Sequence, residues 1–122
     1  MPRKIFAEAN IHPAIRQVIT DQHADILAEV QSAIASDMVV IVGMAQNPFS
    51  KKARKALDKI KASYRYLEYG SYLSQWRRRN ALKMWTGWST FPMVFVKGIL
   101  IGGAVELQRL IDSGEFVRMT KR

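Results

Sequence analysis

The chain has 122 residues, 48% of them hydrophobic and 24% charged, with a net charge of +9, which suits one globular domain. No apolar run approaches the roughly 20 residues of a membrane-spanning helix, and the start, MPRKIFAEANIHP, lacks the apolar core of a signal peptide, so we expect a cytoplasmic protein that binds no membrane. The absence of cysteine excludes disulfides, thiolate metal sites and cysteine nucleophiles, and two histidines predict no metal site.

The first predicted helix runs from Pro13 to about Ser36, where apolar residues recur with a helical period. Met38 to Val42 is a continuous apolar run, typical of a strand buried on both faces. After a loop at 43–46, a second helix is predicted to start with Asn47 as its cap and Pro48 at its first position. Together these segments predict a helix, a buried strand and a second helix.

Tyr64 to Tyr69 is predicted to be a strand parallel to the first, because a helix joins the two. A helix is expected from Ser71 to about Trp85. Two short strands, 93–96 and 99–101, flank a Lys97-Gly98 turn, and a last helix is predicted over 104–113. This order, a β-α-β unit followed by β-β-α, is the thioredoxin-type layout.

The positive charge is concentrated in one part of the chain. Between Pro48 and Lys83 there are eleven lysine or arginine residues and two acidic residues, a balance of +9 that equals the net charge of the whole chain. A field of this kind attracts anions, whether a small carboxylate, a nucleic acid or an acidic protein. For any single lysine, a solvated helix face is the simpler interpretation.

The sequence resembles the glutaredoxin family, and most closely its monothiol members with the motif Cys-Gly-Phe-Ser. The stretch TGWSTFPMVFVKGILIGG, residues 86–103, is similar to the proline loop, hairpin and Gly-Gly of that family. The resemblance implies an α/β thioredoxin-like fold with a four-stranded mixed sheet flanked by helices. It places a glutaredoxin-like domain at 38–122, after an extra N-terminal helix in a helical extension at 1–37.

At the family's active site this sequence has Asn47, Pro48, Phe49 and Ser50, so the nucleophilic cysteine is replaced by asparagine. In such a site, a thiolate at a helix N-terminus exchanges with disulfides or, in monothiol members, ligates an iron–sulfur cluster. Asparagine does neither, and we predict no catalytic residue, no cofactor and no metal. The alternative interpretation of Asn47 is a simple helix cap.

The resemblance also implies where glutathione would bind. These positions are Arg79 and Lys83 before the proline loop, Thr90, Phe91 and Pro92 with a cis bond before the proline, and Gly102, Gly103 and Ala104 at the last helix. Two charged contacts of the family are missing, because Val42 to Met44 holds no lysine and Val105 replaces an aspartate. Glutathione binding is therefore expected to be weak, and for Arg79 a plain surface role is equally compatible with the RRR run.

Three functions remain open from the sequence. The first is a non-catalytic binding or regulatory module with a degenerate groove for a glutathione-like thiol, a peptide or an acidic protein. A homodimer is also compatible with the sequence. The second is a glutathione-dependent thiol–disulfide oxidoreductase or electron carrier, which holds if Ser50 stands in place of a natural cysteine. Nucleic-acid binding through the basic stretch is the least favoured, because the fold has no established groove-reading element.

Overall fold

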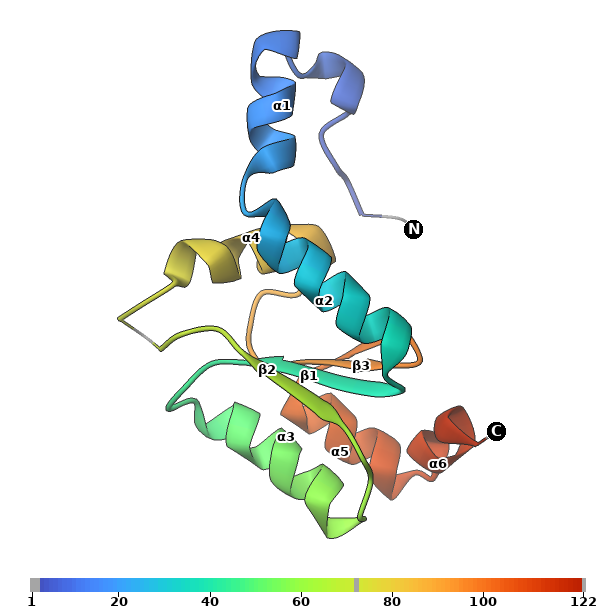
Figure 1. Ribbon diagram of the computed structural model, residues 1–122. Coiled ribbons are helices and arrows are strands. Elements are labelled where there is room, and N and C mark those ends of the chain that lie inside the picture. The colour runs from blue at the N-terminus through green and yellow to red at the C-terminus, as the bar shows by residue number, and fades with distance from the viewer. Residues whose placement is uncertain (1–2, 72, 122) are drawn as a thin grey trace.

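A computed structural model describes residues 3–71 and 73–121, which form a four-stranded sheet with helices on both faces (Figure 1). The strands, in the spatial order β2-β1-β3-β4, are β1 (Val39–Gly43), β2 (Arg65–Glu68), β3 (Met93–Val96) and β4 (Ile99–Gly102). β1 pairs in parallel with β2 and antiparallel with β3, and β3 pairs antiparallel with β4. The predicted four-stranded mixed sheet is confirmed.

The two central strands are buried along their whole length, as their continuous apolar sequences predict. Val40 faces Phe95 and Ile41 faces Val94 across the β1–β3 pair. The turn between β3 and β4 has positive φ at both Lys97 and Gly98, the geometry that matches the right-handed twist of a hairpin.

The helices divide between the two faces of the sheet (Figure 1). They are a 3₁₀ turn at Glu8–Asn10, α1 (Pro13–Asp21), α2 (Ala24–Ser36), α3 (Pro48–Lys59), α4 (Trp76–Thr86), α5 (Ala104–Asp112) and α6 (Glu115–Thr120). α2 and α4 cover one face, where Ile26, Val30 and Leu82 are buried, and α3, α5 and α6 cover the other, where Leu57 and Leu107 are buried. None of the helices within residues 3–71 and 73–121 is long and apolar enough to cross a membrane.

The prediction of a single helix over 13–36 was wrong, because the chain breaks at Gln22 and His23. Gln22 is extended and His23 has a left-handed backbone with φ of 54°. The stretch from Thr20 to His23 is polar, so the apolar stripe of α1 is not continued into α2. α1 buries none of its residues and projects from the body of the molecule (Figure 1), whereas α2 packs on the sheet.

α2 belongs to the same core as the strands, although the predicted boundary at 37/38 assigned this helix to an N-terminal extension. Ile26, Val30 and Ala33 of α2 pack with Val40 and Phe95 of the sheet. Residues before α2 contribute no buried side chain among those the structure describes. Residues 1, 2 and 122, at the ends of the predicted domains, lie outside the described residues.

Two further helix predictions differ from the structure. The helix expected from Ser71 begins only at Trp76, since Gly70 (φ 71°) and Gln75 (φ 55°) have left-handed backbones that end regular structure; Tyr72 lies outside the described residues. α6 was not predicted, and it begins after Gly114, beyond the last predicted helix over 104–113. Phe116 of α6 is buried against α5, which supplies the packing that a six-residue helix needs.

Candidate functional site

The start of α3 carries the segment that takes the place of a thiol motif. Asn47 caps the helix, and its Oδ1 accepts hydrogen bonds from the N–H groups of Phe49 at 2.8 Å and Ser50 at 3.0 Å. Pro48 occupies the first helical position. The predicted cap is confirmed. The asparagine oxygen therefore uses the exposed N–H donors that at a helix N-terminus would stabilise an anion such as a thiolate.

Ser50, the last residue of the motif, is 2% exposed and faces the end of β1. Its Oγ lies 3.5 Å from the Met44 nitrogen. A Cβ on Gly43 would come within 2.6 Å of that oxygen, so the close approach of α3 to β1 needs glycine there. A serine hydroxyl needs an adjacent base to become a nucleophile, and this contact with a backbone N–H supplies none.

The loop before β3 has the backbone geometry that the resemblance implies. The Phe91-Pro92 peptide bond is cis, as predicted. Both residues are buried, while Thr90 is exposed. Lys83 of α4 is half-buried and its Nζ lies 5.8 Å from the centre of the Phe91 ring, which brings one cation to this loop.

The start of α5 faces the same loop. Gly103 caps the helix, and its N–H donates to Glu106 Oε1 at 2.8 Å. Gly102 has φ of 114°, and a Cβ there would meet Glu106 Cγ at 2.7 Å. Glu106 was missed from the sequence, although an acidic residue three positions after a helix cap is a recognisable signal. Val105, at the position where the family has an aspartate, is 50% exposed.

Six of the predicted positions are brought together around one cavity of about 250 Å³. We call it the proline-loop cavity, and its lining is Phe49, Thr90, Phe91, Pro92, Gly103, Ala104, Val105 and Glu106. Trp88 packs close by, since a Cβ on Gly103 would lie 3.9 Å from its Nε1. That indole nitrogen is buried and has no hydrogen-bond partner among residues 3–71 and 73–121.

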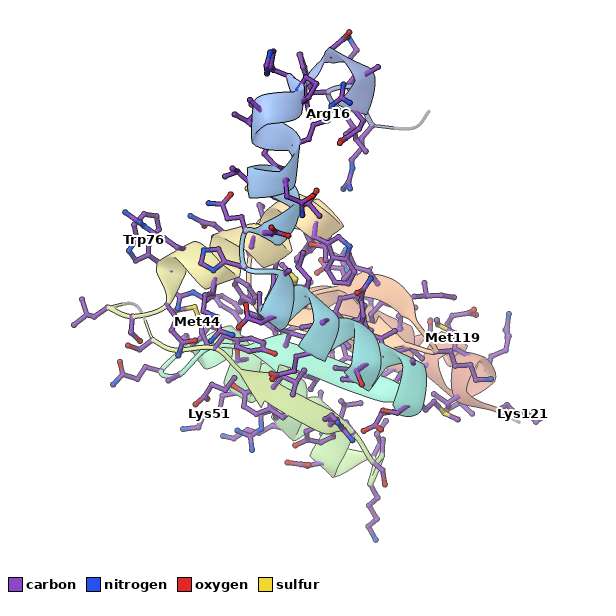
Figure 2. All side chains as sticks on the ribbon, turned by 45° about the horizontal axis from the view of Figure 1, so that its top comes forward. Arg16, Met44, Lys51, Trp76, Met119 and Lys121 are labelled. Atoms are coloured by element: carbon purple, nitrogen blue, oxygen red, sulfur yellow. The ribbon has the colours of Figure 1, made fainter. Side chains whose placement is uncertain are left out.

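Asn47, Pro48 and Ser50 line a different cavity, of about 420 Å³, between α3 and the edge strand β2. Met44 and Lys51 belong to its wall, and Figure 2 shows them at the end of β1 and the start of α3. Its other charged and aromatic members were not predicted from the sequence. These are Arg54, Tyr66 and Glu68.

Tyr66 and its neighbours form a connected polar group in this second cavity. The Tyr66 hydroxyl donates to Glu68 Oε1 at 3.0 Å, and the Arg54 guanidinium lies 4.3 Å from the centre of the Tyr66 ring. Burial, and then the bond to Glu68, raises the pKa of Tyr66 to about 12. Tyr66 and Glu68 are two residues apart on β2, so their side chains lie on one side of the strand, but no pattern in the sequence pairs that side with Arg54 of α3.

Arg79 does not line the proline-loop cavity, to which the resemblance assigned it. Its side chain is 6% exposed, and its Nη1 donates to the carbonyl oxygens of Tyr69, at 2.9 Å, and Ser74. Burial lowers the pKa of Arg79, but a guanidinium stays protonated at any physiological pH. Arg79 therefore holds the loop before α4 in place, and Lys83 is the cation of this helix that reaches the proline loop.

The residues at the start of α3 do not fit an iron–sulfur cluster or another thiolate-bound metal, because the chain has no cysteine. In addition, no group of three histidine or acidic residues with the spacing of a metal site occurs within residues 3–71 and 73–121. We therefore derive no redox step at this site.

Comparison with known proteins identifies the family. The family model for glutaredoxin matches residues 39–101. A glutaredoxin-like protein of Dictyostelium discoideum is 41% identical over 108 residues, which cover 88% of each chain. This chain belongs to the glutaredoxin family. Glutaredoxin-C6 of Oryza sativa subsp. japonica is 30% identical over 91 residues, covering 75% of this chain and 81% of its own.

A solved glutaredoxin has the same fold. The crystal structure of a buckwheat glutaredoxin–glutathione complex superposes with a TM-score of 0.71 at 25% identity, over 82% of this chain and 91% of that chain. The predicted thioredoxin-like fold and glutaredoxin family are thus confirmed, in a chain without cysteine. The closer likeness to monothiol members stays a prediction.

Proposed function

We propose that this chain is a non-catalytic glutaredoxin that binds a short extended thiol peptide of the glutathione class in the proline-loop cavity. The observation that carries the proposal is the grouping of Phe49, the Thr90–Pro92 segment and the start of α5 around one cavity. Beside it, the position of a nucleophile is held by Asn47, whose side chain is already engaged as a cap. The glutathione bound in the buckwheat structure supports this class of ligand.

The binding groups in this proposal belong mostly to the backbone. The first N–H groups of a helix lack intrahelical partners, so those of Ala104 and Val105 are free to donate to a ligand carboxylate. Thr90, exposed before the cis bond, presents its backbone to an extended peptide. Lys83 supplies a positive charge 5.8 Å from the centre of the Phe91 ring.

The affinity in this proposal is low, because two charged contacts that the resemblance implies are absent. Met44, like its neighbours after β1, is not basic, and Val105 is not acidic. Each missing charge-assisted hydrogen bond costs about 1.5–3 kcal/mol. Binding with a Kd of about 1 mM, or about 4 kcal/mol, is therefore expected for glutathione.

Titration of the protein with reduced glutathione and with S-methylglutathione, followed by backbone amide shifts, tests the ligand. We expect the amides of Thr90, Phe91, Ala104 and Val105 to shift with both compounds, since no exchange with the sulfur is involved. Lys83→Gln should weaken binding, whereas the control Lys59→Gln, at the exposed end of α3, should not. Shifts confined to other residues would refute the assigned cavity.

An activity assay tests the absence of catalysis. Asn47 and Ser50 supply no thiolate, so a glutathione mixed-disulfide substrate should be consumed only at the uncatalysed rate. Turnover above that rate would restore the oxidoreductase alternative. We also propose a cytoplasmic location, because glutathione sets the thiol balance of the cytosol.

A further inference from the structure

The proline-loop cavity continues along α5 into a second space. This neighbouring cavity, of about 360 Å³, lies between α3 and α5 and shares Ala104 and Val105 with the proline-loop cavity. The two helices lie side by side under the sheet (Figure 1), and they are in extensive contact. Because Ala104 and Val105 line both cavities, the cavities adjoin at the start of α5, and a ligand in the first is within reach of the second.

The junction of the two cavities is apolar. Val105 is 50% exposed there, and Phe49, which lines the proline-loop cavity from α3, is also 50% exposed. Half-exposed apolar side chains in a concave site favour an apolar group of a ligand, since its burial removes apolar surface from water.

The neighbouring cavity is lined by two cations. Lys52 of α3 and Arg109 of α5 both line it, and both are exposed. The Lys52 Nζ lies 5.8 Å from the centre of the Phe49 ring, close to the apolar junction, whereas Arg109 lies about one helical turn beyond Val105. Its carboxylate, Asp112, accepts a hydrogen bond from Gln108 at 2.9 Å. Within the part of the chain that the structure describes, neither Lys52 nor Arg109 has an acidic group within ion-pair distance. The two cations are thus available to an anion on a ligand.

We propose that the joined groove binds an extended acidic peptide segment of a partner protein, a ligand longer than glutathione. This inference rests on the proposed function, since it uses the proline-loop cavity for the peptide backbone. An apolar side chain of the peptide contacts Phe49 and Val105, and a carboxylate side chain is held by Lys52 and Arg109.

The spacing of the peptide follows from helix and strand geometry. From Val105 to Arg109 the helix rises about 6 Å, and an extended residue spans about 3.3 Å. The acidic residue therefore lies about two positions from the apolar one. A peptide with the pattern apolar-x-acidic matches the groove, and lysine or arginine at the third position is repelled.

The test is fluorescence anisotropy with two labelled hexapeptides that differ only by glutamate or glutamine at the acidic position. The glutamate peptide should bind the full chain roughly fivefold more tightly, and this preference should shrink as salt screens the charges. Lys52→Glu and Arg109→Glu should each abolish or invert the preference. Lys55→Glu makes the same change of charge on α3 at an exposed residue that lines neither cavity. This variant should keep most of the preference for the glutamate peptide.

The outcomes separate this inference from the proposed function. Equal binding of the two peptides would overturn the inference, because no cation would then hold the carboxylate. An equal effect of Lys55→Glu and Lys52→Glu would also overturn it, because the basic field and not the groove would then be responsible. If glutathione still shifts the amides of Thr90 and Val105 in that case, the proposed function stands. Binding of the glutamate peptide with no amide shifts at Thr90 and Phe91 would overturn the inference, whereas the absence of those shifts with glutathione would overturn the proposed function.

Discussion

Position 47 determines the chemistry available to this chain. At this helix N-terminus a cysteine would be stabilised as a thiolate, whereas the asparagine caps the helix. Replacing Asn47→Cys frees the N–H groups of Phe49 and Ser50 and leaves Lys51 close by. The helix dipole and these donors favour a thiolate, so the pKa of the new thiol should fall below the free value of about 8.5. The pH dependence of alkylation measures it, and the background contains no other cysteine.

Ser36→Cys is the matched control for this experiment. Ser36 is exposed and is the last residue of α2, where the helix dipole has the opposite sign, and its hydroxyl donates to the Ala33 carbonyl and to Asp37 Oδ1. Its thiol should show a pKa at or above the free value. Equal pKa values for the two thiols would mean that the start of α3 does not stabilise an anion, and the site would then be no more than a capped helix.

At the scale of elements, α4 depends on a single buried arginine. Arg79 donates to carbonyl oxygens of the loop that precedes the helix, and each hydrogen bond to a charged group contributes about 1.5–3 kcal/mol. Arg79→Gln should lower the free energy of unfolding by about 2 kcal/mol, measured by denaturant titration. Arg77→Gln, on the exposed side of the same helix, should change it by less than about 0.5 kcal/mol.

The same comparison distinguishes a structural role of Arg79 from a role in binding. A variant that keeps full stability but loses glutathione-dependent amide shifts would restore the assignment that the resemblance suggested. The sequence alone does not show which arginine is buried, because the RRR run contains three arginines. Only the fold determines which side chain points inward. Arg78 of the same run instead pairs with Asp25 of α2 at 2.9 Å.

What the sequence predicted well depends on local signals. The strand from Met38, the Asn47 cap and the Lys97-Gly98 turn each follow from a few adjacent residues, and all three are confirmed in type. The break between α1 and α2 has no glycine or proline to mark it, and α6 is held by the tertiary contact of Phe116. The Tyr66 group was missed for a related reason, since it joins a strand and a helix that only the fold brings together.

At the scale of the whole molecule, exposed apolar side chains gather on α1, which projects from the core. α1 has one apolar side, with Ile15, Val18 and Ile19 between 47% and 65% exposed, and Figure 2 shows Arg16 reaching from it toward the N-terminal segment, where it donates to the Ile11 carbonyl. Trp76 projects from the start of α4 on the same side of the sheet. A surface of this kind is a common site of self-association, which is where the expected homodimer would form.

Removing residues 1–22 tests how much the N-terminal segment and α1 contribute to the stability of the core. The truncation removes no buried side chain among the described residues, and it removes the hydrogen bonds of Arg3 to the carbonyls of Trp85 and Thr86 at the end of α4. The free energy of unfolding should therefore fall by no more than about 1–2 kcal/mol. By contrast, Ile26→Ala, in the full chain, opens a cavity under α2 and should cost about 2–5 kcal/mol, although both changes lie before the first strand.

Both proteins should be unfolded in denaturant at two protein concentrations tenfold apart. Linkage requires that a dimer be stabilised at the higher concentration, so a full chain that dimerises through α1 shows a concentration-dependent midpoint that the truncated chain lacks. A truncation that costs as much as Ile26→Ala at both concentrations would contradict the placement of α1 outside the core. A cost that appears only at the higher concentration would instead assign the apolar side of α1 to a second copy of the chain, with α2 as the first element of the glutaredoxin core.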